Sequence, residues 1–169
     1  MTRLTSILDE ALEAWAYARQ GVIAELRNLP APAFGFRPAE GGRTVIELAQ
    51  HIVESGMMMA GELTRPDGDF TRKSFEAFMR EYARGVGRHR TKTRLVALLK
   101  RSHAEGERKI RRAGELFMLR PIRRFDGIEG TRLAWMHHGI AHEEYHRGQL
   151  ALYARLMGKV PALTRLIHG

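Results

Sequence analysis

The sequence predicts an all-α protein, a four-helix bundle with an extra short helix between the second and third long helices. Apolar residues recur at helical spacing in four long segments, whereas the alternation typical of strands is almost absent. All six prolines lie outside these four segments. Each segment would bury one apolar stripe, so packing the four against one another is the simplest way to form one core.

The first helix is expected from about Leu4 to Leu29. Pro30 ends it because a proline lacks the amide hydrogen that the helix would need, and two more prolines make the following connection extended. The apolar stripe of this helix consists of Leu4, Ile7, Leu8, Leu12, Trp15, Ala18, Val22 and Leu26.

The second helix is expected to begin with a capping box and to continue to about Leu63. Thr44 would be the N-cap, and the side chain of Glu47 would reach back to the amide of Thr44. The helix would stop before the turn residues that start at Pro66.

Three further helices complete the expected order. A short helix is predicted from Ser74 to about Arg84, and the third long helix from about Thr91 to Ala113. The fourth long helix would run from about Thr131 to Met157, with Gly158 as the residue that ends it. The loop before the fourth helix contains Pro121, Gly127 and Gly130.

Length and composition limit the class of protein. A chain of 169 residues with 44% hydrophobic residues fits a single folded domain over residues 1–169. The absence of cysteine excludes disulfides, thiolate metal sites and a cysteine nucleophile. Acidic residues interrupt the first twenty positions, and no apolar run approaches the ~18 residues of a membrane span. We therefore expect a cytoplasmic protein with no membrane partner.

The net charge of +9 comes from one segment. Residues 80–124 contain 15 Lys and Arg against 4 Asp and Glu. Such a segment could bind nucleic acid, an anionic membrane surface or an acidic small molecule. No aromatic residues alternate with these arginines to stack on bases. A solvated helix face is the preferred interpretation, and nucleic acid remains a possible partner that is not favoured.

The fourth predicted helix contains candidate metal ligands. His138, His142 and His146 are spaced by four residues and share one face. His138 and His146 are about 12 Å apart along the axis, so one ion can use His138 with His142 or His142 with His146. His51 on the second helix is the best candidate for a third ligand.

Two segments resemble the DinB/YfiT-like family of metalloenzymes. The first runs from Leu29 through Phe36 to Thr44, and continues to His51. The second contains His142 and His146, followed by Arg-Gly-Gln and the stretch to Gly158. Together they cover about a third of the chain, in the family's order and spacing. The chain departs from many relatives at Phe36, where a tryptophan is frequent, and at Tyr145, where a histidine is frequent.

The resemblance implies a four-helix bundle with one divalent ion held by His51, His142 and His146. The ion is nickel, zinc or manganese among relatives. His138 then becomes a residue that lines the pocket or supports the ligands. Relatives include transferases that activate a low-molecular-weight thiol, such as mycothiol or bacillithiol, and glutathione-dependent isomerases. A thiol cosubstrate and a homodimer are the partners that the resemblance implies.

Other residues near these histidines have alternative roles. Glu47 would either cap its helix or orient His51, and the cap is preferred. Glu54 is a better candidate for a hydrogen bond to a ligand or for proton transfer. Gln149 could donate to a substrate oxygen or bridge helices, and Trp135 could form a pocket wall or pack only in the core. Met57, Met58 and Met59 are interpreted as core filling.

Two further expectations concern charge and function. Arg147 is expected to pair with Glu143 on the outer surface of the fourth helix. The leading functional hypothesis is a metal-dependent enzyme, either a thiol-dependent S-transferase or isomerase or a hydrolase. The alternatives are a nucleic-acid-binding or damage-response module, and a non-catalytic protein in which a metal holds two helices together.

Overall fold

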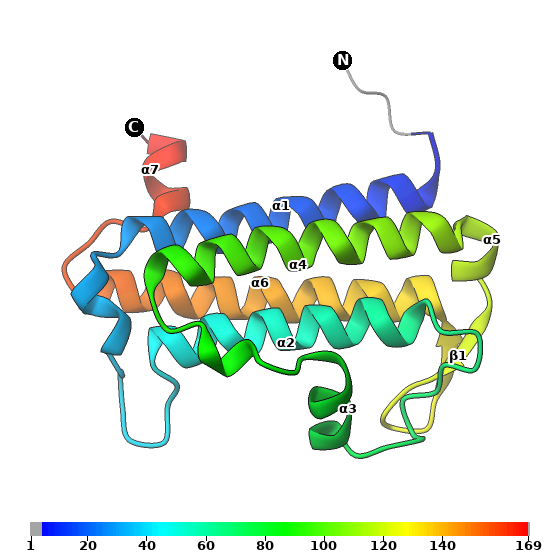
Figure 1. Cartoon of the computed structure of the whole chain (residues 1–169). Coiled ribbons are helices and arrows are strands. Elements are labelled where there is room, and N and C mark those ends of the chain that lie inside the picture. The colour runs from blue at the N-terminus through cyan, green and yellow to red at the C-terminus, as the bar shows by residue number, and fades with distance from the viewer. Residues whose placement is uncertain (1–4, 169) are drawn as a thin grey trace.

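The computed structural model describes residues 5–168 and confirms the predicted four-helix bundle. The four long helices are α1 (Ile7–Asn28), α2 (Val45–Leu63), α4 (Lys92–Ala113) and α6 (Arg132–Leu156). Figure 1 shows them side by side, with α1 and α6 running in one direction and α2 and α4 in the opposite direction.

The order of the helices around the bundle determines which side chains can meet. Helix α1 packs against α4 and α6, and α2 packs against the same two helices. Helices α1 and α2 therefore lie diagonally across the core, as do α4 and α6, whereas α2 and α4 are parallel neighbours. Because α2 and α6 are antiparallel neighbours, the first half of α2 faces the second half of α6 (Figure 1).

Each long helix begins at a residue whose side chain caps it. Ser6, Thr44, Thr91 and Thr131 each accept a hydrogen bond from the amide three residues later. The predicted capping box of α2 is confirmed, since the Thr44 amide donates to Glu47 Oε2 at 2.7 Å. The predicted start at Leu4 lies outside the described residues, and α1 begins at Ile7.

Shorter elements connect the long helices. They are the 3₁₀ helices η1 (Ala31–Gly35) and η2 (Val86–Arg88), helices α3 (Phe75–Tyr82), α5 (Glu115–Met118) and α7 (Ala162–His168), and strands β1 (Pro121–Arg123) and β2 (Glu129–Thr131). Helix α3 is the predicted short helix. The other elements were not predicted, because strands of three residues and a seven-residue helix with no buried residue give almost no periodic signal.

A buried carboxylate attaches α3 and the loop before it to α2. Glu62, which is fully buried, accepts two hydrogen bonds from Arg72 at 2.8 and 2.6 Å and one from Tyr82 Oη at 2.6 Å. The Asp69 amide donates to the same carboxylate at 2.8 Å. These charge-assisted bonds hold α3 against α2.

Gly106 permits the close approach of α4 to α1 and α2. A Cβ atom at this position would lie 2.5 Å from the ring of Trp15 and 3.0 Å from Ala60 Cβ. We expect Gly106→Ala to lower the free energy of unfolding by about 1–3 kcal/mol through overpacking.

The matched control is Gly148→Ala in α6, where a Cβ would meet nothing within 4 Å. It should stabilise the protein by about 1 kcal/mol, because alanine favours the helix. Urea denaturation of both variants measures the difference, and equal effects would contradict this packing.

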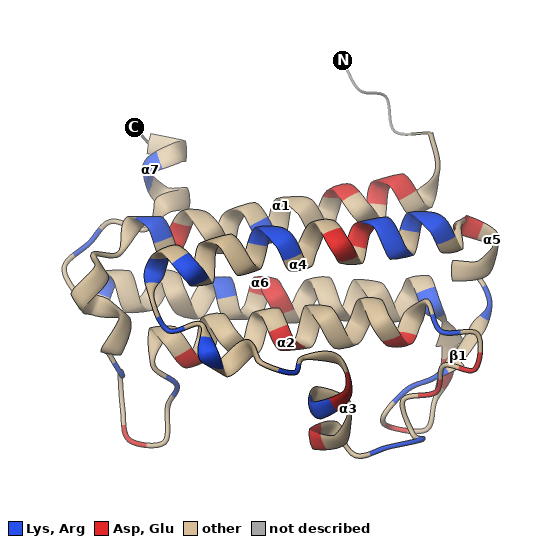
Figure 2. Ribbon diagram, viewed as in Figure 1, with Lys and Arg blue, Asp and Glu red and all other residues tan. Residues whose placement is uncertain are grey.

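The basic segment predicted from the sequence follows α4. Figure 2 shows Lys and Arg at several positions along this helix, where Arg94, Lys100, Arg101, Arg108 and Lys109 are exposed. Exposure agrees with the interpretation of a solvated basic face. None of the helices formed by residues 5–168 is long and apolar enough to cross a membrane.

Candidate metal centre

Three histidines from two helices meet between α2 and α6. His51 Nε2 lies 3.3 Å from His142 Nε2, and His146 Nε2 lies 3.0 Å from His142 Nε2. One ring nitrogen of each histidine lies within 4.8 Å of one from each of the other two. The alternative pairing of His138 with His142 is not the one that meets His51. His138 is exposed, and its Nε2 lies 3.3 Å from Arg124 Nη1.

The secondary structure explains this convergence. His142 and His146 are one helical turn apart, with ring centroids separated by 4.4 Å. His51 comes from the facing helix, and its ring is 5.1 Å from that of His142 and 4.8 Å from that of His146. His146 is only 3% exposed, whereas the other two rings are partly exposed.

Gln149 selects the tautomer of His146. Its carbonyl oxygen Oε1 accepts a hydrogen bond from His146 Nδ1 at 2.7 Å. The proton therefore occupies Nδ1, and the Nε2 lone pair is directed toward the other two histidines. A hydrogen bond of this kind on the far nitrogen is typical of histidines that bind metals.

Two of the three nitrogen separations are close to those of ligands to one ion. Two nitrogens bound tetrahedrally at 2.0–2.1 Å would lie about 3.3 Å apart. The observed distances of 3.3 and 3.0 Å are close to this value. A set of three imidazoles suits most late first-row divalent ions. The residues present therefore fit a bound divalent metal.

The environment of the cluster keeps its imidazoles neutral. Burial lowers the pKa of His51 from 6.5 to about 3, and the positive charge of Arg43 acts in the same direction. Burial and the neighbouring His146 lower the pKa of His142 to about 4. Burial also lowers the pKa of His146. Neutral imidazole is the form that binds a metal, so the three side chains could bind one at neutral pH without losing a proton.

These pKa values predict how the stability of the metal-free protein depends on pH. In the unfolded chain, His51 and His142 take up protons near pH 6.5, whereas in the folded chain they do so only near pH 3 and 4. The unfolded state therefore binds more protons between these limits, and the free energy of unfolding should fall as the pH decreases from 7 to 5. Urea denaturation of metal-free protein measures this slope.

A matched pair of variants isolates the contribution of the cluster. His142→Gln should reduce the slope, because one titrating imidazole is removed. His137→Gln, at an exposed position of the same helix, should leave it unchanged. A slope that is the same in both variants would contradict the prediction.

A buried ion pair lies next to the histidine cluster, because Glu143 directly follows His142 in α6. Glu143 and Arg19 are 3% and 2% exposed, and Arg19 Nη2 donates to Glu143 Oε2 at 3.0 Å. Trp15 Nε1 donates to the same oxygen at 3.0 Å, and Arg19 Nη1 donates to the Leu99 carbonyl at 2.9 Å. The network therefore joins α1, α4 and α6, and it holds Glu143 beside His142.

The predicted pair between Arg147 and Glu143 on the outer surface is wrong. Arg147 Nη1 instead contacts Glu144 Oε1 at 3.1 Å, and its guanidinium lies 5.1 Å from the centre of the Tyr17 ring. Glu143 faces the core because it continues the buried stripe of α6, which is formed by Met136, Ile140, Leu150 and Ala154.

A cavity of about 320 Å³ adjoins the cluster at His142. Trp135 and His138 line it, and their rings lie 4.9 Å apart. Met58 and Met59, predicted as core filling, are buried and also line the cavity. The other lining residues were not predicted from the sequence; among them, Ser55 lies on α2 and Phe75 on α3.

Glu54 lies three residues after His51 on α2 and is partly buried. Burial raises its pKa, and the charge of Arg43 partly opposes this effect. Within residues 5–168, Glu54 makes no hydrogen bond to any of the three histidines. Arg43 itself was not singled out in the sequence, although it precedes the N-cap of α2 and its charge affects all three rings.

Solved structures with the same fold support this architecture. YfiT from Bacillus subtilis, described as a probable metal-dependent hydrolase with an unusual four-helix bundle topology, has a TM-score of 0.71 and 15% identity, covering 94% of this chain and 93% of its own. A DinB-like protein, YjoA, from the same organism has a TM-score of 0.68 and 20% identity, with coverages of 89% and 93%. A protein assigned to the DinB family from Exiguobacterium sibiricum has a TM-score of 0.66 and 18% identity, covering 92% of this chain and 95% of its own.

At these identities the structural likeness shows the fold alone. No curated protein matches the sequence significantly. The family model of the DinB superfamily, however, matches residues 10–150, which include all three clustered histidines. The chain belongs to the DinB superfamily.

Proposed function

We propose that this protein is a metal-dependent enzyme in which His51, His142 and His146 bind one divalent ion, with nickel, zinc and manganese as candidates. The convergence of three neutral imidazole nitrogens beside a cavity carries the proposal. Three protein ligands leave a position open for a small molecule, which is typical of catalytic rather than structural sites. The fold shared with YfiT, a probable metal-dependent hydrolase, supports the same class.

We propose that the nucleophile is a low-molecular-weight thiol. The reaction would be an S-transfer or an isomerisation. A bound ion would lower the pKa of a coordinated thiol or water, or polarise a carbonyl group. The chain contains no cysteine, so the sulfur of such a reaction has to arrive with a cosubstrate. The chain's own part would be to present neutral ligands, with Gln149 orienting His146, and to exclude water with the apolar side chains of the cavity.

Hydrolysis is the second candidate reaction, because water can take the place of the thiol. The description of YfiT favours this alternative. A third candidate is a metal site without catalysis, in which the ion would only connect α2 and α6. The first two candidates require different reactants for turnover, and the third gives no turnover.

A turnover screen separates these reactions. Untagged protein loaded with each metal would be mixed with glutathione, mycothiol or bacillithiol and the electrophile 1-chloro-2,4-dinitrobenzene, and with ester substrates in the absence of thiol. We expect turnover that requires both thiol and metal. In His142→Ala the turnover rate should fall further than the ~10–100-fold loss that follows removal of a residue hydrogen-bonded to a metal ligand. His137→Ala, at an exposed position, is the control.

Each other result of the screen contradicts a different part of the proposal. Ester hydrolysis without thiol would replace S-transfer by hydrolysis. Absence of turnover in fully loaded protein would favour the site without catalysis.

A homodimer is also part of the proposal. Three large apolar side chains on the outer face of α6, Tyr145, Leu152 and Leu156, are 64%, 51% and 58% exposed. An exposed apolar face of this kind is typical of an interface. Sedimentation equilibrium would show a dimer, and Leu152→Glu should convert it to a monomer.

A further inference from the structure

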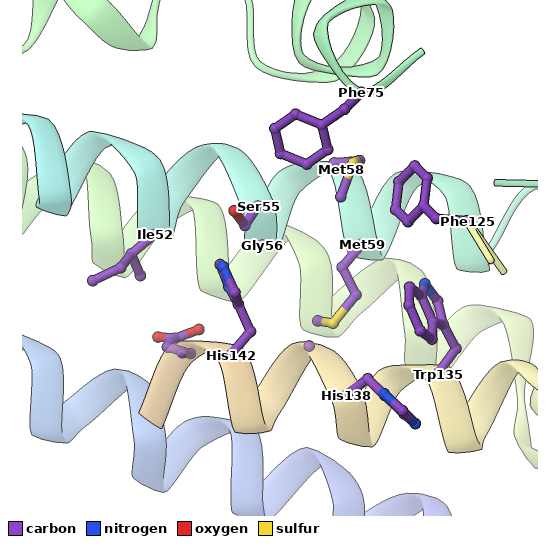
Figure 3. A pocket seen from close by; sticks show the side chains of 12 residues that line it. Ile52, Ser55, Gly56, Met58, Met59, Phe75, Phe125, Trp135, His138 and His142 are labelled. Atoms are coloured by element: carbon purple, nitrogen blue, oxygen red, sulfur yellow. The ribbon is translucent and has the colours of Figure 1, made fainter. Parts of the chain in front are cut away.

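The cavity next to His142 has a polar end and an apolar end. Figure 3 shows Ser55 and His142 close together at one end, with Trp135 and Phe125 at the other. Met59 lies between the two ends. A molecule that fills the cavity would therefore place one part beside the histidine cluster and another against aromatic rings.

The apolar end is formed by elements from three parts of the fold. Trp135 comes from α6, Phe75 from α3 and Phe125 from the loop between β1 and β2. The Trp135 ring lies 6.1 Å from that of Phe125 and 5.3 Å from that of Phe70. Phe75 and Phe125 are each 41% exposed, so part of each ring is available to a ligand in the cavity.

The cavity offers no free charge to a ligand. Its lining, all within residues 5–168, contains no lysine, arginine or aspartate; the titratable side chains are those of His138, His142 and Glu143. Both oxygens of Glu143 are already bonded to Arg19, and one of them also accepts from Trp15. Arg124, whose guanidinium lies 5.5 Å from the centre of the Trp135 ring, is already paired with Asp126 at 2.7 Å. A charged ligand would therefore lose its hydration without gaining a free partner, which makes such a ligand unfavourable.

One polar group at the cluster end lacks a partner. Ser55 Oγ is shielded from solvent and makes no hydrogen bond within the described chain. Buried hydroxyl groups are almost always hydrogen-bonded, because an unpaired one loses the free energy that water would supply. Ser55 lies one helical turn after His51 and lines the cavity, so a ligand oxygen placed beside His142 could accept a hydrogen bond from its hydroxyl group.

From these observations we infer that the cavity binds the organic substrate of the centre, an uncharged molecule with a flat apolar body and one oxygen acceptor. The body packs against Trp135 and Phe125, and the oxygen accepts a hydrogen bond from Ser55. The role as substrate rests on the proposed function, whereas the binding preference rests on the cavity alone. An uncharged aromatic ketone is a simple representative of this class.

Calorimetric titration of metal-free protein with three naphthalene derivatives tests the inference. The probes are 2-acetylnaphthalene, its carboxylated analogue 6-acetyl-2-naphthoate, and 2-ethylnaphthalene, which lacks the oxygen. We expect the ketone to bind at least about tenfold more tightly than the carboxylate, because nothing in the cavity compensates the charge. It should also bind about 3- to 10-fold more tightly than the hydrocarbon, through the hydrogen bond of Ser55.

Variants assign the binding to the two ends. Ser55→Ala should remove the preference for the ketone over the hydrocarbon and leave the affinity for the hydrocarbon unchanged. Phe125→Ala, in the loop between β1 and β2, should weaken both probes by about 5- to 10-fold. Tyr17→Ala removes an aromatic side chain that is 52% exposed on α1 and should change neither affinity.

The outcomes separate this inference from the proposed function. Equal or tighter binding of the carboxylate, or no binding of the ketone, would overturn the inference even if metal binds. Binding of the ketone with the expected preferences, in a protein that takes up no metal, would retain the cavity as a binding site and overturn the metal centre.

Discussion

Glu143→Gln is expected to lower the free energy of unfolding by about 3–5 kcal/mol. The substitution keeps the size of the side chain but removes its charge, so the guanidinium of Arg19, 2% exposed, remains buried without a counterion. The glutamine side chain also has only one acceptor oxygen, so it cannot replace the carboxylate as the acceptor for both Arg19 and Trp15. Urea denaturation at pH 7 measures the loss.

A surface ion pair provides a matched control. Glu107→Gln makes the same chemical change in α4, in a pair with Arg111 in which the two side chains are 32% and 51% exposed. Pairs of this kind contribute at most about 1 kcal/mol, so this variant should be nearly as stable as the wild type. Similar losses in the two variants would contradict the special role of the buried pair.

A double variant tests whether the cost arises from the unpaired charge. Replacing both partners, in Arg19→Met with Glu143→Leu, leaves no buried charge and should recover much of the stability lost in Glu143→Gln. If the double variant were less stable than the single one, the pair itself would contribute net stability.

Much of the fold was predictable because its signals are local. The apolar stripe of α1 and the capping box at Thr44 each depend on residues within a few turns of one helix. The two-stranded hairpin that carries Phe125 depends on pairing between Pro121 and Thr131 across a loop. Segments of three residues have no periodicity that a single sequence could show.

The candidate site was predictable only in part. The spacing of His142 and His146 indicates a pair on one helix, but their meeting with His51 depends on α2 and α6 being neighbours, which the resemblance to a family supplied. The buried pair was missed although its signal was present. Arg19 follows Trp15 by four residues on the apolar stripe of α1, and Glu143 occupies the corresponding stripe of α6. Charges within two apolar stripes predict that they pair across the core.

His51→Ala is expected to abolish the stabilisation that a divalent metal gives to the protein. An ion bound only by the folded state at 100 times its dissociation constant would raise the free energy of unfolding by about 2.7 kcal/mol. His51 is the only one of the three proposed ligands that α2 contributes, so the variant loses the link between α2 and α6 as well as one ligand. The two remaining histidines of α6 would bind the ion much more weakly.

The measurement is the difference in unfolding free energy with and without metal for each variant. This difference cancels any effect of the substitution on the metal-free fold. His138→Ala, which removes an exposed imidazole from α6 one turn before His142, should keep the full stabilisation. Gln149→Ala should reduce it partly, because loss of the bond that orients a ligand costs ~10–100-fold in affinity. Equal stabilisation of the His51 and His138 variants would mean that the ion binds elsewhere, since only a site that includes His51 can separate them.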